Sequence, residues 1–255
     1  MKLTVIGSAD AFNSGGRGHS CYLVQSPGAG ALMIDFGPTA LRGLYALSIP
    51  PNTIDGAVFT HLHGDHIGGF PFLFMDALYN SVRKRELSLL GPVQTRESLE
   101  TVLDACYGDM SAHMASMPVR IDELEPGETR DFLGYRVHGF AADHMQLPHR
   151  PLCLRVVDAH GKSIAFSGDT RMCPGLLGAA DGTDLLVAEC TRLAHPAGAH
   201  CTWDDWQREL PNFRTKRLLL SHLGGDVRAK LPGLTAGVNT SIPVQFAEDG
   251  RVIEL

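Results

Sequence analysis

The sequence predicts a single α/β domain, and three observations support this. The 255 residues are 44% hydrophobic and 20% charged, which is enough apolar material for a substantial core. Short runs of strand-forming residues alternate with segments of helical periodicity. No linker rich in Ser, Gly or Pro divides the chain, so we expect one domain over residues 1–255.

The expected strands form two sets, before and after the middle of the chain, and most end in Gly, Asp or His. The first set covers residues 3–7, 21–25, 31–37 and 56–61. The second set covers residues 135–140, 152–157, 163–168, 184–189 and 217–222. Apolar spacing and polar capping residues predict helices over residues 69–82, 95–106 and 202–210.

Charge and composition exclude several classes of protein. With 22 basic and 28 acidic residues the net charge is −6, which argues against broad nonspecific binding of nucleic acid. No segment has the 18 or more apolar residues of a membrane span, and the apolar run after Lys2 is too short for a secretory signal. We therefore expect a soluble, cytoplasmic protein with no membrane partner. The cysteines form no C-x-x-C motif and are expected to be reduced thiols: Cys21, Cys106, Cys153, Cys173, Cys190 and Cys201.

The most informative segment is HLHGDH, which follows the apolar residues 56–60. His61 and His63 lie two apart in extended backbone and so project to the same side, and the glycine turn can bring Asp65 and His66 back toward them. Imidazole and carboxylate are ligands that suit zinc, manganese or iron. Because one ion takes only three or four of them, we expect two divalent ions, with Zn²⁺ favoured and Mn²⁺ or Fe²⁺ as alternatives.

Further ligands for two ions are expected at the ends of other strands, since strand ends along one edge converge. His144, Asp169 and His222 each follow an apolar strand segment. Taken alone, His144 fits a loop histidine, Asp169 a turn residue and His222 a cap. Together with HLHGDH they indicate one metal centre.

These motifs resemble the metallo-β-lactamase superfamily along nearly the whole chain, and within it the ribonuclease Z and cyclic-phosphodiesterase branch. The resemblance is carried, in chain order, by HLHGDHIGGFPFL, LLGPVQTRESLETVL, ADH, SGDT, AEC, HCT and LLLSH. It implies an αββα sandwich of two facing mixed sheets with helices outside. It also implies the ligand assignment: His61, His63 and His144 on one ion, Asp65, His66 and His222 on the other, and Asp169 bridging both.

A shared hydroxide between two such ions would attack a phosphoryl group in line. Asp65 is a candidate base that would orient this hydroxide. The resemblance also implies His200 of GAHCTW as the proton donor to the leaving group, with Glu189 as its carboxylate partner. Both residues also fit non-catalytic roles, His200 as a solvated loop histidine and Glu189 as a charge at the edge of a sheet. His195 is the nearest competitor for proton donation.

The expected substrate is a small or cyclic phosphodiester. The chain lacks the long Gly/Pro-rich substrate arm of a tRNA-processing ribonuclease Z, and Leu-Gly-Gly at 223–225 replaces the Phe-Ser-x-Arg-Tyr stretch of that family. With the acidic balance, these departures disfavour RNA as a partner. The alternatives are a ribonuclease Z-type endonuclease, an arylsulfatase-, thioesterase- or lactonase-like hydrolase, and a metal-binding scaffold without activity. A homodimer is left open.

Other segments receive structural interpretations. Asp35 in MIDFG resembles a family aspartate that braces the metal loop. The Gly-rich residues 14–20 are expected either to line the mouth of the site or to bind phosphate through backbone amides, with Arg17 and His19 as candidate substrate contacts. Residues 110–117 are either a mobile lid or a methionine-filled core gap. The basic cluster at 83–85 is expected to be a solvated helix end.

Overall fold

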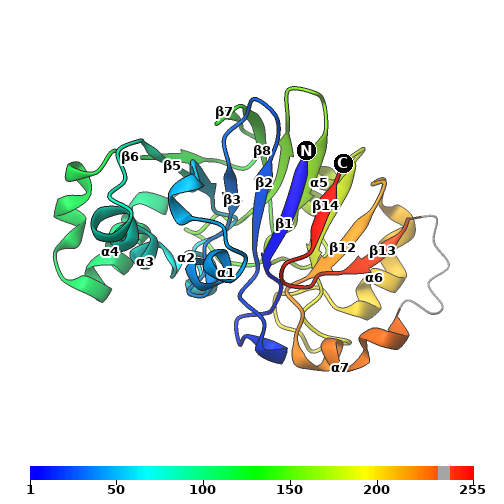
Figure 1. The fold of residues 1–255 in the computed structure, drawn as a ribbon. Coiled ribbons are helices and arrows are strands. Elements are labelled where there is room, and N and C mark those ends of the chain that lie inside the picture. The colour runs from blue at the N-terminus through cyan, green and yellow to red at the C-terminus, as the bar shows by residue number, and fades with distance from the viewer. Residues whose placement is uncertain (235–241) are drawn as a thin grey trace.

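Two seven-stranded mixed sheets face one another in the computed structural model, which describes residues 1–234 and 242–255 (Figure 1). The first sheet has the order β14 (Val252–Glu254), β1 (Lys2–Gly7), β2 (Cys21–Gln25), β3 (Leu32–Ile34), β4 (Gly56–Val58), β5 (Leu87–Pro92) and β6 (Val119–Leu124). The second has the order β13 (Val244–Phe246), β12 (Leu218–Ser221), β11 (Leu185–Glu189), β10 (Ser163–Phe166), β9 (Leu152–Val157), β8 (Tyr135–Ala141) and β7 (Thr129–Phe132).

The helices lie outside the two sheets, so the expected αββα sandwich is confirmed (Figure 1). On the first sheet are α1 (Ala40–Ala46), α2 (Gly64–Ile67), α3 (Phe70–Met75) and α4 (Thr95–Tyr107). On the second are α5 (Pro174–Ala180), α6 (Trp203–Glu209) and α7 (Gly225–Leu234). The shorter helical turns are η1 (Ser14–Gly16), η2 (Pro51–Thr53), η3 (Asp76–Asn80), η4 (Met110–Ser116) and η5 (Leu210–Asn212).

The main core lies between the sheets and is built from alternate side chains of both. Leu3 and Val5 of β1 pack there with Val156 of β9 and Phe166 of β10, all 0–1% exposed. In a strand, successive side chains point to opposite faces, so each sheet also carries a second apolar face that the outer helices cover. This double burial holds the strand ends rigidly, and the functional side chains sit on those ends.

Several expected strands end earlier than the sequence indicates. The segments 31–37 and 56–61 form strand only as β3 and β4, which stop at Ile34 and Val58. Asp35 then adopts a left-handed conformation with φ of 59°, while its amide still donates to the Val58 carbonyl. The chain therefore leaves the sheet just where Asp35 and the HLHGDH motif begin.

The structure adds several short or non-alternating elements that the sequence pattern does not predict: β5, β6, β7, β13, β14, α1, α5 and α7. β5 is buried at every position, so its sequence shows no period of two. The helix expected over 69–82 is α3 followed by a single π turn, η3, and it ends at Asn80.

Burial decides the roles of two peripheral segments, residues 83–85 and 110–117. The expectation of a solvated end for residues 83–85 is wrong for Arg83, which is 6% exposed and donates to the carbonyls of Arg85 and Glu86. Met114 and Met117 of residues 110–117 are buried in the core of the first sheet, which favours the gap-filling role over a lid. Among the described residues, no helix is long and apolar enough to cross a membrane.

Candidate metal centre

The HLHGDH motif leaves the first sheet at the end of β4 and turns back through α2. His63 is the N-cap of α2, and Asp65 and His66 lie inside this short helix. The loop after β3 packs closely against it, because a Cβ atom at Gly37 would overlap the Asp65 carbonyl. The motif is thereby clamped against the exit of β3, which fixes its side chains at the sheet edge.

One group of donors consists of three imidazoles from two sheets. His144, from the loop after β8, places its Nε2 3.0 Å from Nδ1 of His63. His61 lies beside both, with ring centroids 4.9 Å from each. The three candidate ligand atoms lie within 4.8 Å of one another, so they can hold a single ion.

A second group combines two carboxylates with two imidazoles. Nε2 of His66 lies 3.2 Å from Oδ2 of Asp65 and 3.4 Å from Oδ1 of Asp169. Nε2 of His222 lies 3.5 Å from Oδ2 of Asp65 and 3.4 Å from Oδ2 of Asp169. These four residues also form a set whose donor atoms lie within 4.8 Å.

Asp169 stands between the two groups. Its Oδ2 lies 3.7 Å from Nε2 of His61 and 3.8 Å from Nε2 of His144, in addition to its contacts with the second group. All seven residues expected to bind metal are therefore brought together, and Asp169 occupies the position a bridging ligand requires.

The buried atoms of this cluster have the character of metal ligands. Within the part of the chain that the structure describes, Nε2 of His61, Nε2 of His66 and Oδ1 of Asp169 are buried without a hydrogen-bond partner. Such atoms carry a large desolvation cost unless a ligand compensates them. The residues present therefore fit divalent cations.

The pKa shifts point in the same direction. Burial lowers the pKa of His61 well below its ordinary value, which keeps the imidazole neutral. Burial opposes ionisation of Asp169, but the nearby His222 and His66 hold the pKa of its carboxyl well below the usual range. Burial likewise disfavours the charged form of His222, yet Asp169 and Asp65 raise its pKa to about 9. The Asp169 carboxylate thus favours positive charge beside it, while His61 stays neutral, as a metal ligand must.

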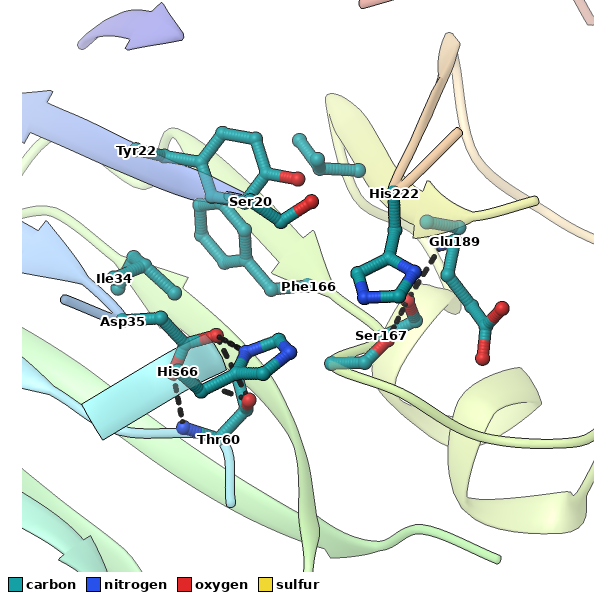
Figure 2. Close-up of a pocket in the computed structure, with 13 residues that line it drawn as sticks. Ser20, Tyr22, Ile34, Asp35, Thr60, His66, Phe166, Ser167, Glu189 and His222 are labelled. Atoms are coloured by element: carbon teal, nitrogen blue, oxygen red, sulfur yellow. Dashed lines mark hydrogen bonds and ion pairs between the residues drawn. The ribbon is translucent and has the colours of Figure 1, made fainter. Parts of the chain in front are cut away.

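A buried network orients the ligands on the side of the first sheet (Figure 2). Asp35, 2% exposed, accepts from Nδ1 of His66 at 2.8 Å and from the Thr60 amide at 2.7 Å. The Thr60 hydroxyl lies 2.9 Å from Asp35 and 3.1 Å from Nδ1 of His61. With Nδ1 occupied in this way, Nε2 of each histidine faces the cluster.

The second sheet supplies an equivalent network around His222. The Thr191 hydroxyl lies 2.9 Å from Nδ1 of His222 and donates to Oε2 of Glu189 at 2.6 Å. His222 itself has a φ of 51°, and such strain in a non-glycine residue costs about 1–3 kcal/mol. Nδ1 of His144 donates to the Ala199 carbonyl at 2.9 Å. The sequence pattern did not point to Thr60 and Thr191. Their only signal is position, because Thr60 precedes His61 and Thr191 lies two residues after Glu189.

Asp35→Asn is expected to weaken binding of the ion nearest His66 by about 10- to 100-fold. The amide removes the charge that orients His66 and presents only one oxygen to donors that now share two. The check is metal affinity measured by competition with a chromogenic chelator.

Asp55→Asn is the matched control. Asp55, just before β4, also accepts a backbone N–H, from Ala31 just before β3 at 2.7 Å, but it lies away from the cluster. The control should keep the affinity of the unmodified protein. Equal metal affinities of the Asp35 variant and the control would show that Asp35 does not brace His66.

His200 and Glu189 form an ion pair at the rim of the same cluster. Nδ1 of His200 lies 3.0 Å from Oε1 of Glu189 and 3.9 Å from Oδ2 of Asp169. Burial disfavours protonation of His200, but the hydrogen bond and charge of Glu189 raise its pKa overall. His195 points elsewhere: it is about half exposed, and its Nε2 lies 2.9 Å from Asp205.

The Gly-rich residues 14–20 do not present their polar side chains freely. Arg17 pairs with Glu248 at 2.7 Å. His19 is 7% exposed, and its Nδ1 lies 3.1 Å from the Thr39 hydroxyl. These contacts favour a structural role for both side chains over direct contact with substrate.

Comparison with known proteins identifies the family. A family model described as Anti-Pycsar protein Apyc1 matches residues 1–242, nearly the whole chain. The chain belongs to the Anti-Pycsar protein Apyc1 family. It is also similar to a ribonuclease Z from Methanothermobacter thermautotrophicus, with 24% identity over 272 residues that cover 88% of this chain and 86% of the relative.

Solved structures establish the fold of this family member as the metallo-β-lactamase fold. The metallo-β-lactamase fold protein YhfI from Bacillus subtilis superposes with a TM-score of 0.79 at 22% identity, covering 99% of both chains. A diphosphatase from the PhnP family superposes with a TM-score of 0.75 at 20% identity, covering 100% of this chain and 97% of that one. The metallo-β-lactamase fold that the sequence resemblance implies is thus confirmed.

Proposed function

We propose that this protein is a dinuclear-metal-dependent phosphodiesterase that acts on a small or cyclic phosphodiester. The observation that carries the proposal is the position of Asp169 between the two donor groups, with the His200–Glu189 pair within 3.9 Å of it. A scaffold that only binds metal needs the seven expected ligands, whereas a histidine paired with a carboxylate beside them supports catalysis.

Two divalent ions bound here would supply an activated water and neutralise charge on the phosphoryl oxygens. The chain's own residues would do the rest. Asp65 is partly exposed within the cluster, and interactions with His222 and His66 hold its pKa well below the usual range despite its burial. It is therefore ionised at neutral pH and suited to accept a hydrogen bond from the attacking water, which would orient that water.

His200 is the proposed proton donor to the leaving oxygen. Glu189 engages Nδ1 at 3.0 Å, which leaves Nε2 of the same ring to donate toward substrate. Glu189 is 2% exposed and is held by the Thr170 amide at 2.8 Å and by Thr191. The pair therefore presents an oriented imidazole whose raised pKa favours the protonated form, as general acid catalysis needs.

The surface beside His200 suits a small substrate. An open cavity of about 520 Å³ lies there, within the roughly 300–1,000 Å³ of small-molecule sites. Among the described residues that line it, Asp10 and Asp226 are acidic, and Arg192 already pairs with Asp226 at 3.2 Å. Such a lining disfavours the many phosphate contacts on which RNA binding depends.

We expect the metal-loaded protein to hydrolyse a small cyclic phosphodiester and bis(4-nitrophenyl) phosphate, and to leave precursor tRNA essentially uncut. The reason is the acidic cavity together with the missing substrate arm. Rates on these three substrates, measured at matched enzyme concentration, check the prediction.

Protein stripped of metal by a chelator is the control, and its activity should fall to background. A nitrophenyl sulfate, a lactone and a thioester complete the panel, because the same centre would polarise a sulfate ester or a carbonyl. Faster turnover of any of these would change the assigned substrate class. Efficient processing of precursor tRNA would support the ribonuclease Z alternative, and no hydrolysis of any ester at full metal occupancy would support the scaffold.

A further inference from the structure

The cavity beside His200 has an exposed aromatic ring in its wall. Phe12, in the loop between β1 and β2, lines this cavity of about 520 Å³ together with His200. It is 87% exposed, the highest value among the large apolar residues that the structure describes. Exposed apolar side chains are common on a surface, but one in the wall of a cavity that reaches the proposed proton donor is placed to contact a ligand.

The loop that carries Phe12 is held in place by hydrogen bonds on both sides of it. The Asp10 carboxylate, 5% exposed, accepts from the Phe12 amide at 3.2 Å and from the Ser14 amide at 3.1 Å. The Ser14 hydroxyl donates to the same carboxylate at 2.9 Å, and the Asn13 amide donates to the Asp10 carbonyl at 3.2 Å. Because the backbone is already ordered, a ligand that packs against Phe12 loses little affinity to ordering this loop.

The rest of the cavity wall suits an uncharged group. Residues 196–198, a proline, an alanine and a glycine, bring no charge to it. Both carboxylates in the wall are already engaged: Asp10 by its own loop, and Asp226 by the Leu193 amide and the Arg192 guanidinium, each at 3.2 Å. A flat neutral ring can therefore enter without leaving a charge buried and unpaired.

Gly225, the first residue of α7, keeps this cavity open. The turn η1 and the helix α7 lie side by side (Figure 1). A Cβ atom at Gly225 would meet the Ser14 hydroxyl at 3.8 Å and, among the described residues, nothing else within 4 Å. Because Ser14 and Gly225 both line the cavity, a long side chain at position 225 would occupy its space.

We propose that Phe12 is the specificity-determining residue of this site, a platform on which a flat aromatic group of the substrate stacks while the phosphoryl group lies at the metal cluster. Stacking of two rings adds about 2- to 10-fold to affinity beyond apolar contact alone. Since the cavity reaches His200, the stacked group lies on the side of the leaving oxygen. Its role in substrate choice rests on the proposed function, whereas binding of the ring does not.

The test is the affinity of the zinc-loaded protein for two inert phosphonates, measured by calorimetry. Benzylphosphonate and cyclohexylmethylphosphonate carry the same anionic group and rings of similar size, but only the first ring is flat. Burial of apolar area alone would favour the larger saturated ring. We expect the protein to bind benzylphosphonate about fivefold more tightly, and equal affinities or the opposite preference would overturn the platform.

Variants assign this preference to Phe12 and to the cavity. Phe12→Leu keeps an apolar side chain but should abolish the preference, and Phe12→Tyr should retain it. Gly225→Leu should weaken binding of both ring compounds about tenfold but leave methylphosphonate, which has no ring, unaffected. Phe72→Leu is the matched control, because Phe72 is also partly exposed, at 41%, but lies on α3 and packs against Tyr107.

The outcomes separate this inference from the proposed function. A preference that persists in Phe12→Leu, or ring binding unchanged in Gly225→Leu, would overturn the platform even if the protein hydrolyses phosphodiesters. A change of oligomeric state in Phe12→Leu would also overturn it, because the ring would then serve contact between copies of the chain. A preference that Phe12→Leu abolishes, in a protein that hydrolyses no ester, would support the platform and contradict the proposed function.

Discussion

Asp169→Ala is expected to reduce bound metal from two ions per chain to one or fewer. The carboxylate lies between both donor groups, so its loss removes a ligand from each ion and the charge that holds them together. Since such ions contribute several kcal/mol of charge stabilisation, hydrolysis should fall by about 10³-fold or more. Metal analysis of the purified, fully loaded variant supplies the measurement.

Two further variants separate bridging from general damage. His222→Ala should keep one ion, held by the three histidines of the first group. Asp143→Asn is the matched control, because this aspartate precedes His144 but is exposed and pairs with Arg171 at 3.1 Å. It should retain two ions. One ion in the unmodified protein, or two in the His222 variant, would contradict the dinuclear assignment.

The cluster of candidate ligands was predictable from the sequence because its residues follow a local rule. His61, His63, Asp65 and His66 lie within six residues, and each remaining ligand ends a recognisable apolar strand. The strands that carry these residues end at the same edge of the sandwich, so the topology brings the residues close together. The sheet arrangement itself came from family resemblance, since periodicity alone indicated only an α/β domain.

The parts that the sequence did not predict depend on contacts between distant segments. Thr191 matters because β11 and β12 are neighbours in the second sheet, which places it between Glu189 and His222. This contact leaves no pattern of spacing along the chain, so only the three-dimensional arrangement reveals it.

His200→Ala should slow hydrolysis of a phosphodiester with a poor alkoxide leaving group by about 10²- to 10⁴-fold while both metals stay bound. The seven other donors already satisfy two ions, so the loss is one of proton donation. Bis(4-nitrophenyl) phosphate should be affected far less, because nitrophenolate departs without protonation. The ratio of kcat/KM losses for the two substrates is the measurement.

The neighbouring residues make this ratio decisive. Glu189→Gln should reproduce the pattern in weaker form, since the carboxylate that raises the pKa of His200 is gone but the imidazole remains. His195→Ala is the matched control: this histidine lies five residues away on the same loop but pairs with Asp205 instead, and its loss should affect neither substrate. Equal losses on both substrates in the His200 variant would exclude proton donation. Loss of metal from that variant would make His200 a ligand, as its place within 4.8 Å of His144 and Asp169 allows, and the leaving group would then need another donor.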